Sequence, residues 1–279
     1  MKRVLGKVGL QAVVVLSSIL LSGCNSSSSN VAQNTNPIGE ERATITSDNV
    51  DVILATSVSG IDKLASLVDG VVEQLPTFSS KNRSITDIDI TTKDCENGGD
   101  ISVDKLTTSG ATLNFTECRE KGYLLNGIVV VDSDGDSYDA TFKNFNAANS
   151  VDDITLTDAT AHIVGEDYNF FIATGNATVK GNPIEVQNFT IDKKDRKANT
   201  NGSLKSGCVG AWIDIATTES LQYDESDNLT DGQLLVTGNS SDISVSINQD
   251  GSVTVLLNGS LYKEYDSVDS LPQYSEYCF

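Results

Sequence analysis

Apolar residues in the first quarter of the chain recur at the spacing of a helix. Between positions 47 and 75 they return every three or four residues: Val50, Ile53, Leu54, Val58, Ile61, Leu64, Leu67, Val68, Val71, Val72 and Leu75. This period places them along one side of an α-helix. Ser47 or Asp48 can cap its start, Pro76 ends it, and two glycines within it mark places for a kink. We therefore predict an amphipathic helix, or a pair of helices, within residues 44–76.

From about residue 84 to the end of the chain, apolar and polar residues alternate. Stretches such as FFIATGNATV, IEVQNFTID and SVTVLLNG are rich in Val, Ile and Thr, which favour β-strands. Turn residues separate them, for example Asp250-Gly251, and short turns of this kind join antiparallel strands. The pattern predicts roughly a dozen strands, in the range of a meander, sandwich or barrel. We expect a mainly β fold in which residues 44–279 form a single domain. Its large antiparallel, curved meander packs against the N-terminal helix.

The first 24 residues have the pattern of an export signal. Lys2, Arg3 and Lys7 precede an apolar run that extends from residue 8 to 21 and is interrupted by only three polar residues. A permanent membrane-spanning helix needs about 20 apolar residues, so this run is too short for one. A short apolar run after basic residues is typical of a secretory signal peptide.

The end of this run, Leu21-Ser22-Gly23-Cys24, resembles the lipobox of bacterial lipoproteins. The resemblance implies a signal peptide at residues 1–23, cleavage after Gly23, and acyl chains on Cys24 that bind the protein to a membrane. Because residue 25 is Asn rather than Asp, the resemblance also implies the outer membrane of a Gram-negative cell, at its periplasmic face or at the cell surface. Residues 24–43 are rich in Ser and Asn, and we expect them to form a flexible tether.

The net charge of the chain limits the classes of partner that it can bind. Its formal net charge is −20. Without the three basic residues of the signal peptide, 16 basic residues remain against 39 acidic ones, which gives −23. Such a surface repels phosphate backbones, so we expect no nucleic-acid partner. Apolar residues make up 38% of the chain, enough for a packed core.

Four cysteines remain after Cys24, and an even number in an exported chain predicts two disulfides. Three pairings are open. If residues 101–103 face residues 113–115 in a hairpin, Cys118 lies opposite Gly98 and close to Cys95, so we favour Cys95–Cys118 and, by remainder, Cys208–Cys278. A metal site is disfavoured, because the chain has no C-x-x-C and a single histidine.

The spacing around this hairpin resembles that of uncharacterised β-rich lipoproteins of Gram-negative bacteria. The resemblance rests on Cys95-x-x-Gly-Gly, Phe115-x-x-Cys118 and Leu125-Asn126-Gly127, and covers about 35 residues. It implies a β fold and no assigned activity.

The stretch DSDGDSYD, residues 132–139, has the spacing of oxygen ligands for calcium. An EF-hand loop that began at Asp132 would need glycine at its sixth position and glutamate at its twelfth, but Ser137 and Lys143 stand there. A weak, non-helical calcium site formed by Asp132, Asp134 and Asp136 stays open as an alternative.

A hairpin turn explains the same stretch more simply. Asp134-Gly135 is a favoured two-residue turn, and it would place Val131 opposite Tyr138. The basic run at residues 193–197 is interpreted in the same way, as a solvated hairpin tip.

No catalytic residues emerge from the sequence. His162 alternates with apolar neighbours in a predicted strand, and no nucleophile motif accompanies it. Trp212 falls on the side of its strand opposite to Ile213, and we expect it to be buried, with an exposed platform for a sugar or partner as the alternative.

The expected function is a non-enzymatic binding or structural role in the cell envelope, without a cofactor, toward an unidentified protein or glycan. One alternative is a carrier that holds an apolar ligand between helix and sheet. Another is a surface hydrolase that uses two carboxylates.

Overall fold

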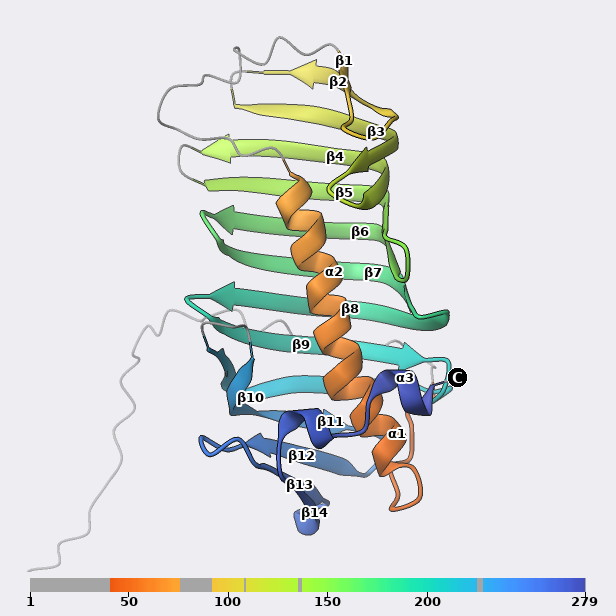
Figure 1. Cartoon of the computed structure of the whole chain (residues 1–279), viewed down its shortest axis with the longest axis vertical. Coiled ribbons are helices and arrows are strands. Elements are labelled where there is room, and N and C mark those ends of the chain that lie inside the picture. The colour runs from red at the N-terminus through yellow and green to blue at the C-terminus, as the bar shows by residue number, and fades with distance from the viewer. Residues whose placement is uncertain (1–40, 76–91, 108, 135–136, 225–227, 279) are drawn as a thin grey trace, which may run out of the picture. The chain divides into compact units, whose positions relative to one another are not determined.

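The structure is a computed structural model that describes residues 41–75, 92–107, 109–134, 137–224 and 228–278 (Figure 1). All the described residues belong to one compact unit. The predicted signal peptide, Cys24 and most of the predicted tether lie outside the described residues. Residues 41–43, which the sequence placed in the tether, are part of the folded body.

The predicted helix is confirmed as three consecutive segments: α1 (Val50–Leu54), η1 (Ala55–Ser59) and α2 (Gly60–Gln74). Segment η1 has the wider turns of a π-helix, and in it the Thr56 hydroxyl donates a hydrogen bond of 2.9 Å to the Val52 carbonyl. The helix starts later than predicted, because its N-cap residue is Asn49 rather than Ser47 or Asp48. The side-chain oxygen of Asn49 accepts a hydrogen bond from the Thr46 N–H in the turn before the helix.

The strands form one antiparallel sheet in which each pairs with the next along the chain. Within the described residues there are fourteen: β1 (Thr92–Asp94), β2 (Asp100–Leu106), β3 (Gly110–Glu120), β4 (Tyr123–Asp134), β5 (Ser137–Ala148), β6 (Asp153–Val164), β7 (Asp167–Val179), β8 (Asn182–Lys194), β9 (Lys197–Ser206), β10 (Ile213–Tyr223), β11 (Leu229–Thr237), β12 (Asp242–Ile247), β13 (Val253–Leu257) and β14 (Ser260–Tyr265). The order is an uninterrupted meander, and the sheet is not closed, since β1 and β14 do not pair with each other. The predicted fold class is confirmed.

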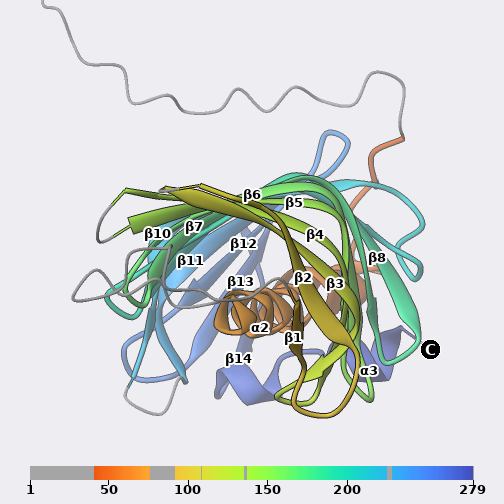
Figure 2. The ribbon, with the colours of Figure 1, turned by 90° about the horizontal axis from the view of Figure 1, so that it is seen from above.

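Bulges in neighbouring strand pairs curve the sheet. They interrupt the ladders of β3–β4, β4–β5 and β8–β9, among others. Gly127 of β4, with φ of 114°, lies against Asn144 of β5, with φ of 47°, and Gly202 of β9 lies in the same way against Asn188 of β8. A β-carbon on either glycine would strike the backbone of the neighbouring strand. Bulges bend strands and increase their twist, and Figure 2 shows the sheet arching over the helix.

The core lies between the concave face of this arch and the helix. Phe142 contacts Phe145 and Phe170 with ring centroids 5.4 and 5.3 Å apart, and all three side chains are buried. Leu64 and Val68 of α2 are buried in the same cluster. The apolar positions of the strands therefore face inward, as their alternation predicts.

Two predicted registers can be compared with the observed ladders. Ile101 lies opposite Phe115, and Val103 opposite Leu113, as predicted. The β4–β5 hairpin is confirmed, but the predicted register is wrong by two residues. Val131 lies opposite Ala140 and not opposite Tyr138. A slip of two residues keeps every side chain on the same face, so the apolar pattern alone does not distinguish the two registers.

The C-terminal segment crosses to the helix after β14. It forms η3 (Val268–Ser270) and α3 (Tyr274–Tyr277), and α3 contacts α1 and η1. Cys278 then bonds to Cys208, which lies between β9 and β10. The last turn of the chain is thus fixed both to the helix and to the sheet.

Candidate functional site

The concave face is the place where a carrier would hold an apolar ligand, and the helix occupies it. Figure 2 shows α2 inside the arch of the sheet. Ile61, Leu64, Leu67, Val68 and Val71 of α2 are at most 5% exposed and belong to the same core cluster as the inward residues of the strands. Entry of a ligand between helix and sheet would require the helix to leave this position.

Carboxylates on the helix bind tyrosines of the sheet. Asp69 of α2 accepts hydrogen bonds from the Tyr168 hydroxyl at 2.7 Å and from the Lys193 ammonium group at 3.0 Å. Asp51 of α1 accepts one of 3.3 Å from the Tyr265 hydroxyl. Burial, reinforced by the nearby carboxylate, raises the pKa of both tyrosines, so each stays a neutral donor. These contacts hold the helix to the sheet at two separate points.

A strap formed by residues 41–45 ties the N-terminal end of the described body to the sheet. The Ala43 N–H donates to the Trp212 carbonyl at 2.9 Å, and the Trp212 N–H donates to the Glu41 carbonyl at 3.1 Å. On its other side, Ala43 contacts the turn between β11 and β12, where its carbonyl accepts a hydrogen bond of 2.7 Å from the Asn239 N–H. Ala43 is 6% exposed. The strap is therefore part of the fold.

An ion pair attaches the strap to the convex face. Asp214 alternates with the buried Ile213 and Ile215 of β10, so its side chain lies on the convex side. Its carboxylate is 2.8 Å from the Arg42 guanidinium and accepts a hydrogen bond of 2.5 Å from the Ser203 hydroxyl. The side chains of Arg42 and Asp214 are only 15% and 23% exposed, which limits screening of the pair by solvent.

Trp212 is buried under this region, as predicted. It is 2% exposed, and the Lys205 ammonium group lies 6.0 Å from its ring centroid. Its indole N–H has no hydrogen-bond partner within the described part of the chain. The alternative of an exposed aromatic platform at Trp212 is therefore wrong. The sequence analysis placed Asp214 beside Trp212, but it did not predict that Arg42 of the strap would pair with Asp214.

An open pocket of about 360 Å³ lies beside the strap. It is lined by strap residues such as Glu41 and Thr44, by Asn49 and Val52 at the start of the helix, and by the loop around Cys208. The Asn49 side chain donates to the Thr44 carbonyl at 2.9 Å and is thus used within the fold. The mixed lining does not have the character of an apolar carrier cavity.

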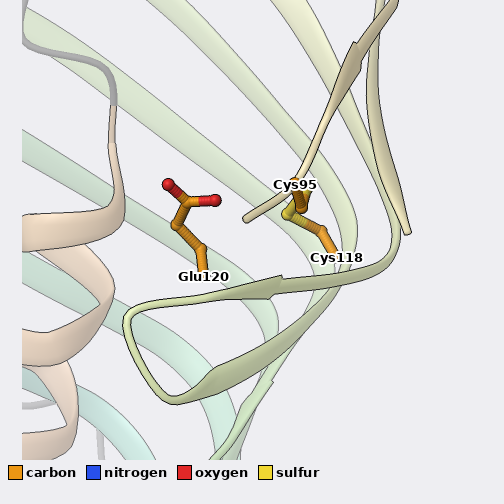
Figure 3. Close-up of side chains that lie close together, drawn as sticks. All are labelled: Cys95, Cys118 and Glu120. Atoms are coloured by element: carbon orange, nitrogen blue, oxygen red, sulfur yellow. A yellow bond between two sulfur atoms is a disulfide. The ribbon is translucent and has the colours of Figure 1, made fainter. Parts of the chain in front are cut away.

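Both favoured disulfides are formed. Cys95 bonds to Cys118 with Cα atoms 5.4 Å apart, and Cys208 bonds to Cys278 with Cα atoms 5.1 Å apart. Figure 3 shows Glu120 near the first pair, and this trio is the one group of metal-ligand residues that lie together in the described part of the chain. Sulfurs joined to each other are not thiolate ligands, and the Glu120 carboxylate accepts a hydrogen bond from the Glu96 N–H at 3.1 Å.

The remaining candidate residues lie on the convex face or at hairpin tips. His162 is exposed on the convex face of β6, where its Nδ1 lies 2.7 Å from the Asp139 carboxylate of β5. Asp132 lies opposite Asp139. The predicted calcium site falls partly on residues 135–136, outside the described residues. The basic run is a hairpin tip as predicted, because Asp195 and Arg196 join β8 to β9.

Comparison with known proteins gave no match: neither a family model, nor a curated protein, nor a solved structure matches this chain. Among the described helices, none has both the length and the apolar character needed to cross a membrane.

Proposed function

We propose that this protein is a lipid-anchored lipoprotein of the outer membrane that binds an envelope partner without catalysing a reaction. The observation that carries the proposal is the strap. A domain joined to a membrane through its N-terminus transmits any pull on that end to its first folded residues. Here those residues are fixed to the sheet by main-chain hydrogen bonds and by the Arg42–Asp214 ion pair.

The strap also supports a defined orientation of the sheet. Sixteen residues separate Cys24 from Glu41, and a chain reaches at most about 3.5 Å per residue, so the folded body stays within roughly 60 Å of the anchor. The start of β10 and the β11–β12 turn are the parts of the sheet that the strap contacts. We expect this end to lie nearest the membrane. The convex face is then the surface presented to a partner, because the helix occupies the concave one.

The anchor is tested by replacing Cys24 with serine in the full chain. The expected result is loss of radiolabelled palmitate incorporation and release of the protein from outer-membrane fractions. The matched control is Cys118→Ser, which removes a cysteine from the folded body and leaves labelling unchanged. Incorporation that persists in Cys24→Ser refutes the anchor.

The binding role is tested by photo-crosslinking in intact cells. A photoreactive amino acid at Asn201, an exposed position on the convex face, is compared with one at Lys263 on the edge strand β14, which is also exposed. We expect high-mass adducts from position 201 only. If no exposed position on the convex face gives adducts, a binding role for this face is refuted.

A further inference from the structure

On strands β3 to β13, one row of side chains on the convex face carries no charge, and at β2 the position opposite Thr112 is Lys105. On β3 to β8 its members lie opposite one another in the ladders: Thr112, Val130, Thr141, Thr160, Phe171 and Thr190. The same row continues over β9 to β13 as Asn201, Ala216, Leu235, Ser244 and Leu256. None of these eleven side chains is buried. We call this set the neutral row.

The charges of the convex face lie on both sides of the neutral row. On one side, Asp132, Asp139 and Asp192 belong to the next row of the same face. On the other side lie Lys143, Asp158 and Asp214, and Asp214 is paired with Arg42. In a chain of net charge −20, an uncharged path across eleven strands whose border rows hold more acidic than basic residues disfavours polyanions and does not oppose neutral ligands.

The side chains of the neutral row match the two surfaces of a sugar. Hydroxyl and amide groups, as in Thr141, Thr160 and Asn201, can donate to and accept from ring hydroxyls. The Phe171 ring is a flat apolar surface of the kind that packs on the C–H face of a pyranose. Polar and apolar members are mixed along the whole row, which suits a ligand that presents both surfaces in every unit.

The geometry of the row suits a linear polymer. Neighbouring strands are about 4.8 Å apart, so eleven strands give a path of roughly 50 Å that is one side chain wide. One strand spacing is close to the length of a sugar unit in an extended polysaccharide. A compact protein partner would instead need a broad patch with an uncharged centre, and the acidic rows flank this path too closely for that.

We infer that the neutral row binds a linear, uncharged polysaccharide laid across the strands, with roughly one sugar unit for each strand. This inference rests on the proposed function and names the class of its partner. Contact with the ligand is made by hydroxyl and amide groups and by Phe171, while the flanking rows, in which acidic residues outnumber basic ones, disfavour phosphorylated and uronic-acid polymers.

The test is calorimetric titration of the full chain, purified in detergent, with linear neutral β-1,4-linked oligosaccharides of increasing length. Polygalacturonate is the anionic probe of similar shape. Affinity is expected to rise with length up to about ten units and to be absent for the anionic probe. Phe171→Ala should weaken binding roughly three- to tenfold.

Two matched variants locate the site. Asn201 belongs to the neutral row, and Asn176 is an exposed asparagine on the convex face outside it. Asn201→Glu should weaken binding about tenfold or more, because it places a charge against a neutral ligand, and Asn176→Glu should change it less than about twofold. Equal effects of the two substitutions, or preference for the anionic probe, would overturn the inference.

Failure of polysaccharide binding and failure of the proposed function give different experimental results. Adducts at position 201 that contain only protein, together with no binding of neutral oligosaccharides, would overturn the polysaccharide and leave a binding role in place. Oligosaccharide binding by the purified chain combined with unlabelled Cys24 would support the neutral row and refute the anchor.

Discussion

Replacing Gly127 with alanine tests whether the bulges determine the curvature of the sheet. Gly127 has φ of 114°, a conformation that side-chain-bearing residues rarely adopt. An added β-carbon would strike the carbonyl oxygen of Asn144 and lie 2.7 Å from the Cα atom of Phe145. Both neighbours are main-chain atoms of β5, so the clash is relieved only if the two strands move apart.

The expected loss of stability follows from these two effects. The unfavourable φ costs about 1–2 kcal/mol, and forcing an extra carbon into a packed site costs about 1–3 kcal/mol. Alanine restricts the unfolded chain and returns about 0.4–1 kcal/mol. The free energy of unfolding should therefore fall by about 1–5 kcal/mol, against the 5–15 kcal/mol typical of a folded domain.

Gly165→Ala is the matched control. Gly165 also has a positive φ, of 64°, but no atom lies within 4 Å of its added β-carbon. Only the conformational cost remains, and the net loss should be about 1 kcal/mol or less. Urea unfolding with the disulfides intact, followed by circular dichroism, measures both variants. If Gly127→Ala costs no more than Gly165→Ala, the close contact at the bulge does not constrain the sheet as argued.

Three further predictions concern the contacts that hold the helix, the strap and the C-terminus. Asp69→Ala should lower the free energy of unfolding by about 1–3 kcal/mol, since it removes an ion pair worth roughly 0–1 kcal/mol when partly exposed and a tyrosine hydrogen bond to a carboxylate. Asp62→Ala, at an exposed site on the same helix, should change it by less than about 0.5 kcal/mol in the same urea titration. Arg42→Ala should loosen the strap and shift the emission of Trp212, the single tryptophan, to longer wavelength; an unchanged spectrum would show that the ion pair does not hold the strap. Burial raises the pKa of Tyr274 from 10 to about 12. Its contribution to stability is therefore complete below pH 10 and is lost as the pH rises from 10 towards 12. Urea midpoints across this range should fall less for Tyr274→Phe than for the unsubstituted protein.

The alternation of apolar residues was sufficient to predict the fold because each strand has one buried face. Ile213 and Ile215 alternate with Asp214, and the same rule applied along the chain gives strands, turns and a single inward face. The pairing of Ile101 with Phe115 followed from this rule, and with it the Cys95–Cys118 disulfide.

The neutral row could not be predicted, because it depends on how all the strands are aligned. Each bulge shifts the register of its ladder, as Gly127 does between β4 and β5. A one-residue error at any strand would place the following residues on the opposite face, and a two-residue error would move them to another row of the same face. The strap could not be predicted for a different reason. It has only five residues, 41–45, and its hydrogen bonds to Trp212 are made by main-chain atoms, which carry no sequence pattern.

An open sheet must protect its edges, and the way this chain does so is consistent with the proposal that a face of the sheet is the binding surface. Among the described residues, the terminal strand β1 has three residues, and the other terminal strand, β14, carries Lys263 and Glu264. Short, charged edge strands disfavour the addition of another strand. Within the described part of the chain, the helix fills the concave face, and the convex face outside the strap contacts is the large surface of the sheet that no other element covers. Its uncharged path is thus the place where a binding partner is best sought.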